Sequence, residues 1–81
     1  MKIRVRLFAS FREAVGGGTL VWDAPDAATV SEVVTALRAT YPRLGPTSEK
    51  ALLAVNQEYV SGDLRLNDGD ELALIPPVSG G

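Results

Sequence analysis

One amphipathic helix constrains this fold more than any other feature of the sequence. Apolar residues recur at helical spacing between positions 30 and 41 and therefore form one stripe: Val30, Val33, Val34, Leu37 and Tyr41. Thr29 and Glu32 have the spacing of a capping box, in which each side chain accepts the other residue's backbone N–H. Pro42 ends the helix because it lacks the N–H that the next turn needs. The stripe must be covered by a second layer, and we expect that layer to be a sheet.

Segments with strand periodicity stand on both sides of the helix. In the first, Ile3, Val5 and Leu7 alternate with basic residues, which predicts a strand with one buried face and a basic outer face. Further strands are expected at 19–22, 51–56 and 71–75. The order ββαββ with one main helix predicts an α+β fold, in which a mixed sheet carries that helix across one face.

Local signals predict the connections between these elements. Ser10 and Glu13 repeat the capping-box spacing, so a short helix should begin at Ser10 and end at Gly16. The chain from 43 to 50 is expected to be loop, and Gln57-Glu58 is expected to be a tight turn that leads into 59–60. The Asn-Asp-Gly-Asp run at 67–70 predicts a turn held by Asx side chains, because it lacks the ligand spacing of an EF-hand calcium loop.

The absence of two residue types limits the chemistry that the chain can perform. It has no cysteine and no histidine, so thiol catalysis, disulfides and the commonest metal ligands are excluded, and we predict no metal site and no bound cofactor. The net charge is −2 and the basic residues are scattered, which argues against a nucleic-acid partner. No apolar run resembles a signal peptide or a membrane span, so we expect a cytoplasmic protein without a membrane partner.

The last six residues read as a tail on a domain of residues 1–75. They are Pro76, Pro77, Val78, Ser79, Gly80 and Gly81. The two prolines fix two φ angles and should hold the tail extended as it leaves the last strand. Gly80 has no side chain and could pass through a narrow channel, and the α-carboxylate of Gly81 is the reactive group that we expect the tail to present.

Three apolar residues are expected at the surface. Phe8 falls on the outward register of the first strand, and Ile75 falls on the outward register of the last, since Leu72 and Leu74 take the inward one. Tyr59 follows a turn and should also be exposed. If the sheet brings these residues together, they form an apolar patch of the kind that marks a protein interface.

Several blocks of this sequence carry a resemblance to a known family. They are Leu7-Phe8-Ala9, Arg12-Glu13, Ala54-Val55-Asn56-Gln57, Leu66, Asp68-Gly69-Asp70-Glu71 and the complete 76–81 tail. With these blocks the chain resembles, from end to end, the family of small sulfur-carrying subunits of molybdopterin synthase, which have the ubiquitin-like β-grasp fold. The 68–71 block and the tail are the specific ones.

The resemblance implies a chemistry and a set of partners. An E1-like activating enzyme would use ATP to adenylate the Gly81 carboxylate, and a sulfur donor would convert it to a thiocarboxylate. The sulfur would then attack a cyclic pterin precursor inside a heterotetramer with the large synthase subunit, which would supply the catalytic residues. The resemblance also implies that Phe8, Arg12, Tyr59 and Ile75 contact partners, together with the tail residues Pro76, Pro77, Val78 and Ser79.

The residues leave other functions open. The same tail would suit a carrier for a different thiolation pathway, such as thiazole, tRNA or amino-acid sulfur transfer. A ubiquitin-like modifier would use the same adenylation and then form isopeptide bonds to lysines. A binding module with an inert terminus would use none of this chemistry.

Overall fold

The computed structural model describes residues 1–45, 48 and 50–77, and it contains helices and strands at nearly all of the expected places. In chain order the elements are β1 (Lys2–Leu7), α1 (Ala9–Val15), β2 (Thr19–Asp23), α2 (Val30–Thr40), the 3₁₀ helix η1 (Pro42–Leu44), β3 (Leu52–Val55), β4 (Glu58–Tyr59) and β5 (Glu71–Ile75). The expected α+β class is confirmed. The order is ββαβββ rather than ββαββ, because β4 is a strand of its own.

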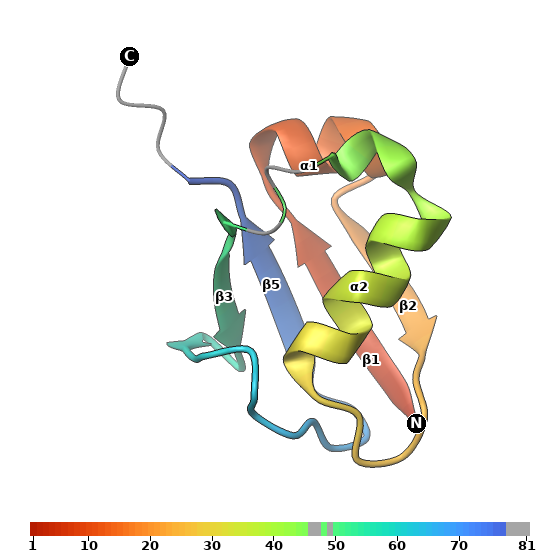
Figure 1. The fold of residues 1–81 in the computed structure, drawn as a ribbon, viewed down its shortest axis with the longest axis vertical. Coiled ribbons are helices and arrows are strands. Elements are labelled where there is room, and N and C mark those ends of the chain that lie inside the picture. The colour runs from red at the N-terminus through yellow and green to blue at the C-terminus, as the bar shows by residue number, and fades with distance from the viewer. Residues whose placement is uncertain (46–47, 49, 78–81) are drawn as a thin grey trace.

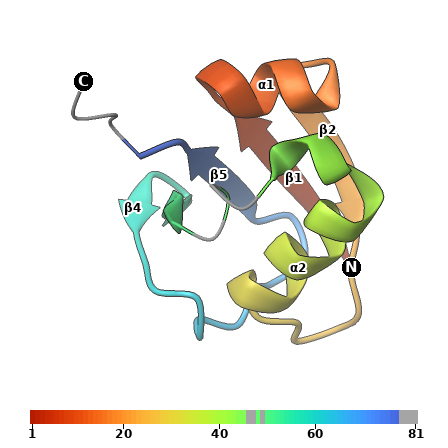
Figure 2. The same cartoon turned by 45° about the horizontal axis from the view of Figure 1, so that its top comes forward.

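The strands form one mixed sheet with the order β2-β1-β5-β3-β4 (Figures 1 and 2). β1 and β5 pair in parallel, although they come from opposite ends of the chain, and the other neighbours are antiparallel. α2 crosses one face of the sheet, and α1 lies over the end where β1 finishes (Figure 1). The other face carries the outward side chains of β1, namely Lys2, Arg4 and Arg6, and we call it the open face.

The core lies between the sheet and α2. β1 alternates strictly between exposed and buried residues, as its sequence predicts, and β5 buries Leu72 and Leu74. The stripe of α2 supplies the opposite wall, with Val30, Val33, Val34 and Leu37 buried and Tyr41 packed at the margin. Phe11 of α1, Leu44 of η1 and Leu66 close the remaining sides. Burial of these side chains is the main contribution that holds the layers together.

The capping box of α2 is present as expected. The Thr29 hydroxyl oxygen accepts the Glu32 N–H at 3.2 Å, and Glu32 Oε1 accepts the Thr29 N–H at 2.9 Å. Hydrogen bonding of the Glu32 carboxylate to Thr29, chiefly to its backbone N–H, lowers the pKa of this carboxyl group. The carboxylate is therefore the form that caps the helix, and the contribution of this cap to stability is lost as pH falls through that lowered pKa.

The N-cap of the short helix lies two residues before Ser10, the position expected from the capping-box spacing. α1 begins at Ala9, its N-cap is Phe8, and no side chain caps it, so Ser10 and Glu13 do not form a capping box. The backbone turns sharply at Ala9, where φ is +49°, and this turn brings Phe11 into the core. Burying a large aromatic ring outweighs a cap that contributes about 1 kcal/mol. The end at Gly16 is confirmed, with φ +90° and its N–H on the Arg12 carbonyl oxygen at 2.9 Å.

Two later connections also differ from the sequence prediction. The turn between β3 and β4 is formed by Asn56 and Gln57, both at positive φ, and not by Gln57-Glu58. Asn56 tolerates this conformation, and its side chain fixes the turn to β5: its Oδ1 accepts the Glu71 N–H and its Nδ2 donates to Asp70 Oδ1, both at 3.1 Å. The expected loop at 43–50 begins inside η1, because Pro42 starts a new helical turn that buries Leu44.

The 67–70 turn is held by carboxylates, as the sequence predicts. Asp70 Oδ2 accepts the Asn67 N–H at 2.8 Å, and Asp68 Oδ1 accepts the Lys2 N–H at 2.7 Å. Gly69 occupies a left-handed position with φ +84°. In the part of the chain that the structure describes, no helix is both long and apolar enough to cross a membrane.

Candidate functional site

Phe8, Tyr59 and Ile75 line one shallow depression of about 190 Å³ on the open face. Its remaining lining residues come from β1, β3, β5 and the β3–β4 turn: Arg6, Ala54, Gln57, Glu71 and Ala73. The three apolar residues were expected at the surface separately, and the sheet brings them together because β5 lies between β1 and β3. The sequence predicted one patch only if the sheet placed these three residues together, and the structure does so.

Strand register explains why this surface is hollow. Ala54 of β3 is opposite Ala73 of β5 on one side and opposite Tyr59 of β4 on the other. Two methyl groups therefore form the floor, while the larger side chains of Tyr59, Ile75 and Phe8 stand around it. Directly opposed residues share a face of the sheet, so the depression faces away from α2.

The rim of the depression is apolar and accessible. Tyr59 is 74% exposed and Phe8 37% exposed, whereas Ile75 is half-buried. Leu52 is 46% exposed and lies directly opposite Ile75 on β3, so it extends the same apolar surface. Single exposed apolar residues are ordinary, but three of them gathered around the half-buried Ile75 form a patch of the kind found at interfaces. We call Phe8, Leu52, Tyr59 and Ile75 the apolar patch.

Sequence reasoning missed Leu52 and the two alanines of the floor. The segment 51–56 is almost entirely apolar, so it gives no alternation that separates its two faces. The register with β5 separates them, because Leu53 and Val55 are opposite the buried Leu74 and Leu72. Leu52 then falls on the open face. The inward alternation of β5, which the sequence does reveal, could have identified Leu52 once the pairing of β3 with β5 was known.

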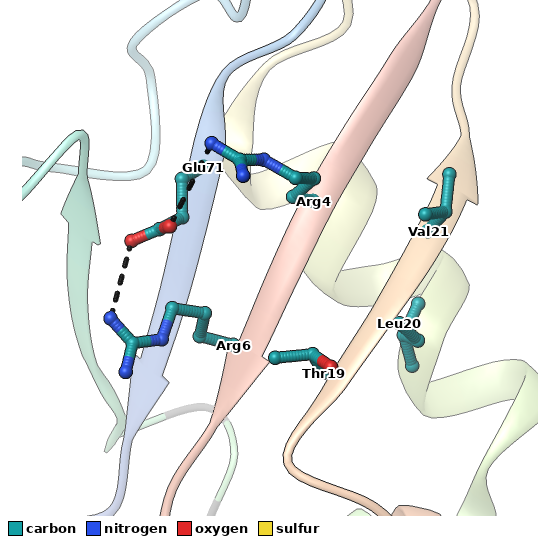
Figure 3. A pocket seen from close by; sticks show the side chains of 6 residues that line it. All are labelled: Arg4, Arg6, Thr19, Leu20, Val21 and Glu71. Atoms are coloured by element: carbon teal, nitrogen blue, oxygen red, sulfur yellow. Dashed lines mark ion pairs between the residues drawn. The ribbon is translucent and has the colours of Figure 1, made fainter.

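Two charged side chains, Arg6 and Glu71, line the depression beside the apolar patch. Arg6 stacks its guanidinium over Phe8, 5.3 Å from the ring centroid, which is within cation–π range. Glu71 lies between the two arginines of β1, with its oxygens 3.6 Å from Arg6 Nη1 and 3.9 Å from Arg4 Nη2 (Figure 3). Both arginines are well exposed, so these ion pairs are screened by solvent and each contributes little to stability. Of the two arginines, only Arg6 lines the depression, where its guanidinium lies beside both Phe8 and Glu71.

The other expected site residues are placed differently. Arg12 is exposed on α1, one helical turn after Phe8, and its N–H donates to the Phe8 carbonyl oxygen at 3.4 Å, but it does not line the depression. Pro76 and Pro77 follow Ile75 directly and are half-buried, which puts the base of the tail next to the apolar patch. Val78, Ser79, Gly80 and Gly81 lie outside the described residues. Among the described residues, no three acidic side chains gather in a way that could hold a metal ion.

Comparison with known proteins gives a consistent relationship over the whole chain. The ThiS family model matches residues 5–81. A molybdopterin synthase sulfur carrier subunit of Escherichia coli is 45% identical, with 98% of this chain and 99% of that protein covered. One from Dictyostelium discoideum is 42% identical and covers 99% and 96%. A crystal structure of small archaeal modifier protein 1 from Haloferax volcanii superposes with a TM-score of 0.83 at 30% identity, covering 95% and 98%. The chain therefore belongs to the ThiS family, together with these sulfur carrier subunits and with the same ubiquitin-like fold.

Proposed function

We propose that this protein is the sulfur carrier subunit of a molybdopterin synthase and carries sulfur on the C-terminal carboxyl group of Gly81. The observation that supports this most strongly is the full-length relationship to proteins of that name, which runs through the diglycine. In this proposal, residues 1–75 form the folded domain and 76–81 form the reactive tail.

The proposed chemistry has three steps. An activating enzyme joins the Gly81 carboxylate to the α-phosphate of ATP and releases pyrophosphate, which gives an acyl-adenylate. A sulfur donor then displaces AMP and leaves a thiocarboxylate. The sulfur finally attacks the cyclic pterin precursor, and water restores the carboxylate. The chain has no histidine or cysteine to act as base or thiol, so the catalytic residues of each step belong to the partners.

The apolar patch is the proposed docking surface. It stands at the base of the tail, since Ile75 belongs to the patch and Pro76 follows it. A partner that covers the patch therefore receives the tail in a defined position, and the two prolines limit the conformational freedom that binding removes. The activating enzyme and the large synthase subunit would use the same surface in turn, each carrier serving one half of a heterotetramer.

The test is to recover the protein from cells and identify its C-terminal group by mass spectrometry. The expected product is a thiocarboxylate at Gly81, visible as the mass gain of one oxygen replaced by sulfur. The matched control is a strain without the activating enzyme, in which the plain acid is expected. Finding only the acid in both strains would contradict the proposal.

Gly80 is proposed to act through its lack of a side chain. Gly80→Val should fold like the parent protein, because every core residue lies within 3–74. The isopropyl group should nevertheless keep the tail out of a narrow active-site channel, so adenylate formation with the cognate activating enzyme should fall at least tenfold. Gly80→Ala is the graded control, and its rate of adenylate formation should lie between those of the parent protein and Gly80→Val. An undiminished rate with valine would contradict the channel argument.

A ubiquitin-like modifier is the second candidate, and the similarity to small archaeal modifier protein 1 favours it. Both functions need an adenylated Gly81, but the modifier ends in an isopeptide bond to a lysine of another protein. The same recovery experiment separates them, because trypsin digestion of a conjugate yields a branched peptide and a thiocarboxylate does not. Service to another thiolation pathway would give the thiocarboxylate without restoring molybdopterin synthesis in a cell that lacks its own carrier.

A further inference from the structure

β2 is the long free edge of the sheet. It lies at one end of the strand order, and the strand at the other end, β4, has only two residues (Figures 1 and 2). Edge strands are usually protected from pairing by prolines, bulges or central charges. β2 reads Thr-Leu-Val-Trp-Asp, with apolar residues at its centre and its one charge at the end. Val21, the middle residue, is 63% exposed.

The hydrogen bonds that flank β2 show which backbone groups face outward. Met1 and Ala24 exchange both bonds, at 2.7 and 2.9 Å, and the Leu7 N–H donates to the Gly18 carbonyl oxygen at 2.9 Å. In an antiparallel ladder, hydrogen-bonded pairs alternate with pairs that are not hydrogen-bonded. Leu20 and Trp22 therefore bond to β1. The N–H and C=O groups of the alternate residues, from Thr19 through Val21 to Asp23, point away from the sheet.

This edge is complementary to itself. If two copies of β2 run antiparallel around a two-fold axis at Val21, each Val21 exchanges both hydrogen bonds with Val21 of the other copy. Thr19 then pairs with Asp23 of the second copy, and every outward backbone group named above has a partner. We propose that two copies of this protein associate through β2 in this register and form one continuous sheet.

Side chains on the helix-covered face fit the same register. Leu20 and Trp22 are half-buried there and pack against the core of their own domain. In the dimer Leu20 is opposite Trp22 of the second copy, at a non-hydrogen-bonded position where side chains approach most closely. Trp22 also borders a hollow of about 220 Å³, lined by residues of the following loop and of α2: Ala24, Pro25, Ala28, Glu32, Val33 and Ala36. The second copy's Leu20 would cover the exposed side of this indole ring.

Charges on the open face are complementary as well. Figure 3 shows Thr19 and Val21 on β2 beside Arg6 and Arg4 on β1. Lys2 pairs with Asp23 of its own chain at 2.6 Å. Across the dimer, the register places Asp23 of one copy next to Thr19 of the other, and Arg6 stands directly behind that threonine. On the two-fold axis, Val21 of one copy is opposite Val21 of the other. In each copy Arg4 lies next to Val21 on β1, and Glu71 lies next to Arg4 on β5. No like charges oppose each other directly across the axis.

This association leaves the apolar patch free. The patch lies over β5, β3 and β4, whereas the proposed dimer forms at the opposite edge of the sheet. A dimer could therefore present two tails and two docking surfaces. The proposal does not depend on sulfur chemistry, so it can fail while the proposed function holds.

Sedimentation equilibrium of the full chain tests the dimer. Two edges of five residues bury less than a standard interface, so we expect a dissociation constant on the order of 10–1,000 μM. Hydrogen exchange supplies a local readout. The Val21 amide should exchange quickly in the monomer and become protected as concentration rises, whereas the Leu20 amide should be protected throughout. A protein that stays monomeric to about 2 mM, or a Val21 amide whose exchange ignores concentration, would overturn the proposal.

Substitutions at Val21 distinguish backbone pairing of β2 from nonspecific hydrophobic association. Val21→Pro removes an outward donor, which edge strands tolerate, so the variant should fold and remain monomeric. Val21→Thr keeps the donor and the β-branch and should still dimerise.

Val21→Glu and Val21→Lys should each be monomeric because like charges meet on the axis, and mixing them should restore a dimer. This charge exchange tests the register even if the proline variant fails to fold. The proposed register would be refuted if both charged variants still formed dimers, or if their mixture stayed monomeric. It would also be refuted if β2 paired with a strand of another protein and not with a second copy of this chain.

Discussion

Deletion of Gly81 should leave the fold intact and abolish sulfur transfer. The folded state does not depend on this residue, because the core is built from side chains between Ile3 and Leu74. Transfer depends on it completely, since the carboxyl carbon must reach the activating site and a misplacement of about 1 Å can cost roughly 100-fold in rate. One alanine placed after Gly81 should be equally inactive, because it moves the carboxyl group by a full residue.

The measurement is molybdopterin formation in a mixture of carrier, activating enzyme, sulfur donor, large subunit and precursor. Thermal unfolding of each variant should match the parent protein, which shows that loss of activity is not loss of structure. Chemical ligation of a thiocarboxylated glycine to the truncated chain is a matched rescue and should restore a single round of transfer. Cofactor synthesis by the truncated chain without this rescue would mean that the reactive group is elsewhere.

The double variant Phe8→Lys, Ile75→Lys should bind its partners at least 100-fold more weakly than the parent protein. Removing an apolar side chain from water contributes about 1.5–3 kcal/mol when burial is complete, and about 1.4 kcal/mol corresponds to a tenfold change in affinity. Phe8 and Ile75 begin partly covered, so the loss should fall near the lower end of that range for each residue. Two lysine ammonium groups in the covered patch add a desolvation cost. Titration calorimetry against the activating enzyme and the large subunit provides the affinities.

Val21→Lys is the matched control for this experiment. It places the same charge at an apolar position of the open face that is more exposed than Phe8 or Ile75 and lies at the far edge of the sheet. It should leave affinity for both partners within about twofold of the parent, the usual range for a substitution away from an interface. Unchanged affinity in the double variant, with unchanged thermal unfolding, would place the docking surface elsewhere. A large fall in the unfolding temperature would instead mean that these side chains support the core.

Local periodicity determined those parts of the fold that a single segment can specify. The stripe and capping box of α2, the alternation of β1 and the bounds of β5 follow from spacing within a dozen residues, and the structure confirms them. The family was also evident from the sequence, because its specific blocks lie together at the end of the chain. The start of α1 was not evident, since burial of Phe11 against distant residues decided it. The β3–β4 turn shifted for a similar reason, because Asn56 is bonded to β5.

The sequence by itself determined which side chains face outward on β1 and β5, and the tertiary structure alone decided which of them meet. Phe8 and Ile75 come from opposite ends of the chain, and only the parallel pairing of β1 with β5 makes them neighbours. The same strand order adds Leu52 and Tyr59 to the apolar patch, leaves Arg12 outside it and puts β2 at the free edge. The physical reason is that alternation repeats within a strand, whereas strand order is set by hydrogen bonds and core packing between segments far apart in sequence. No local pattern contains those long-range contacts.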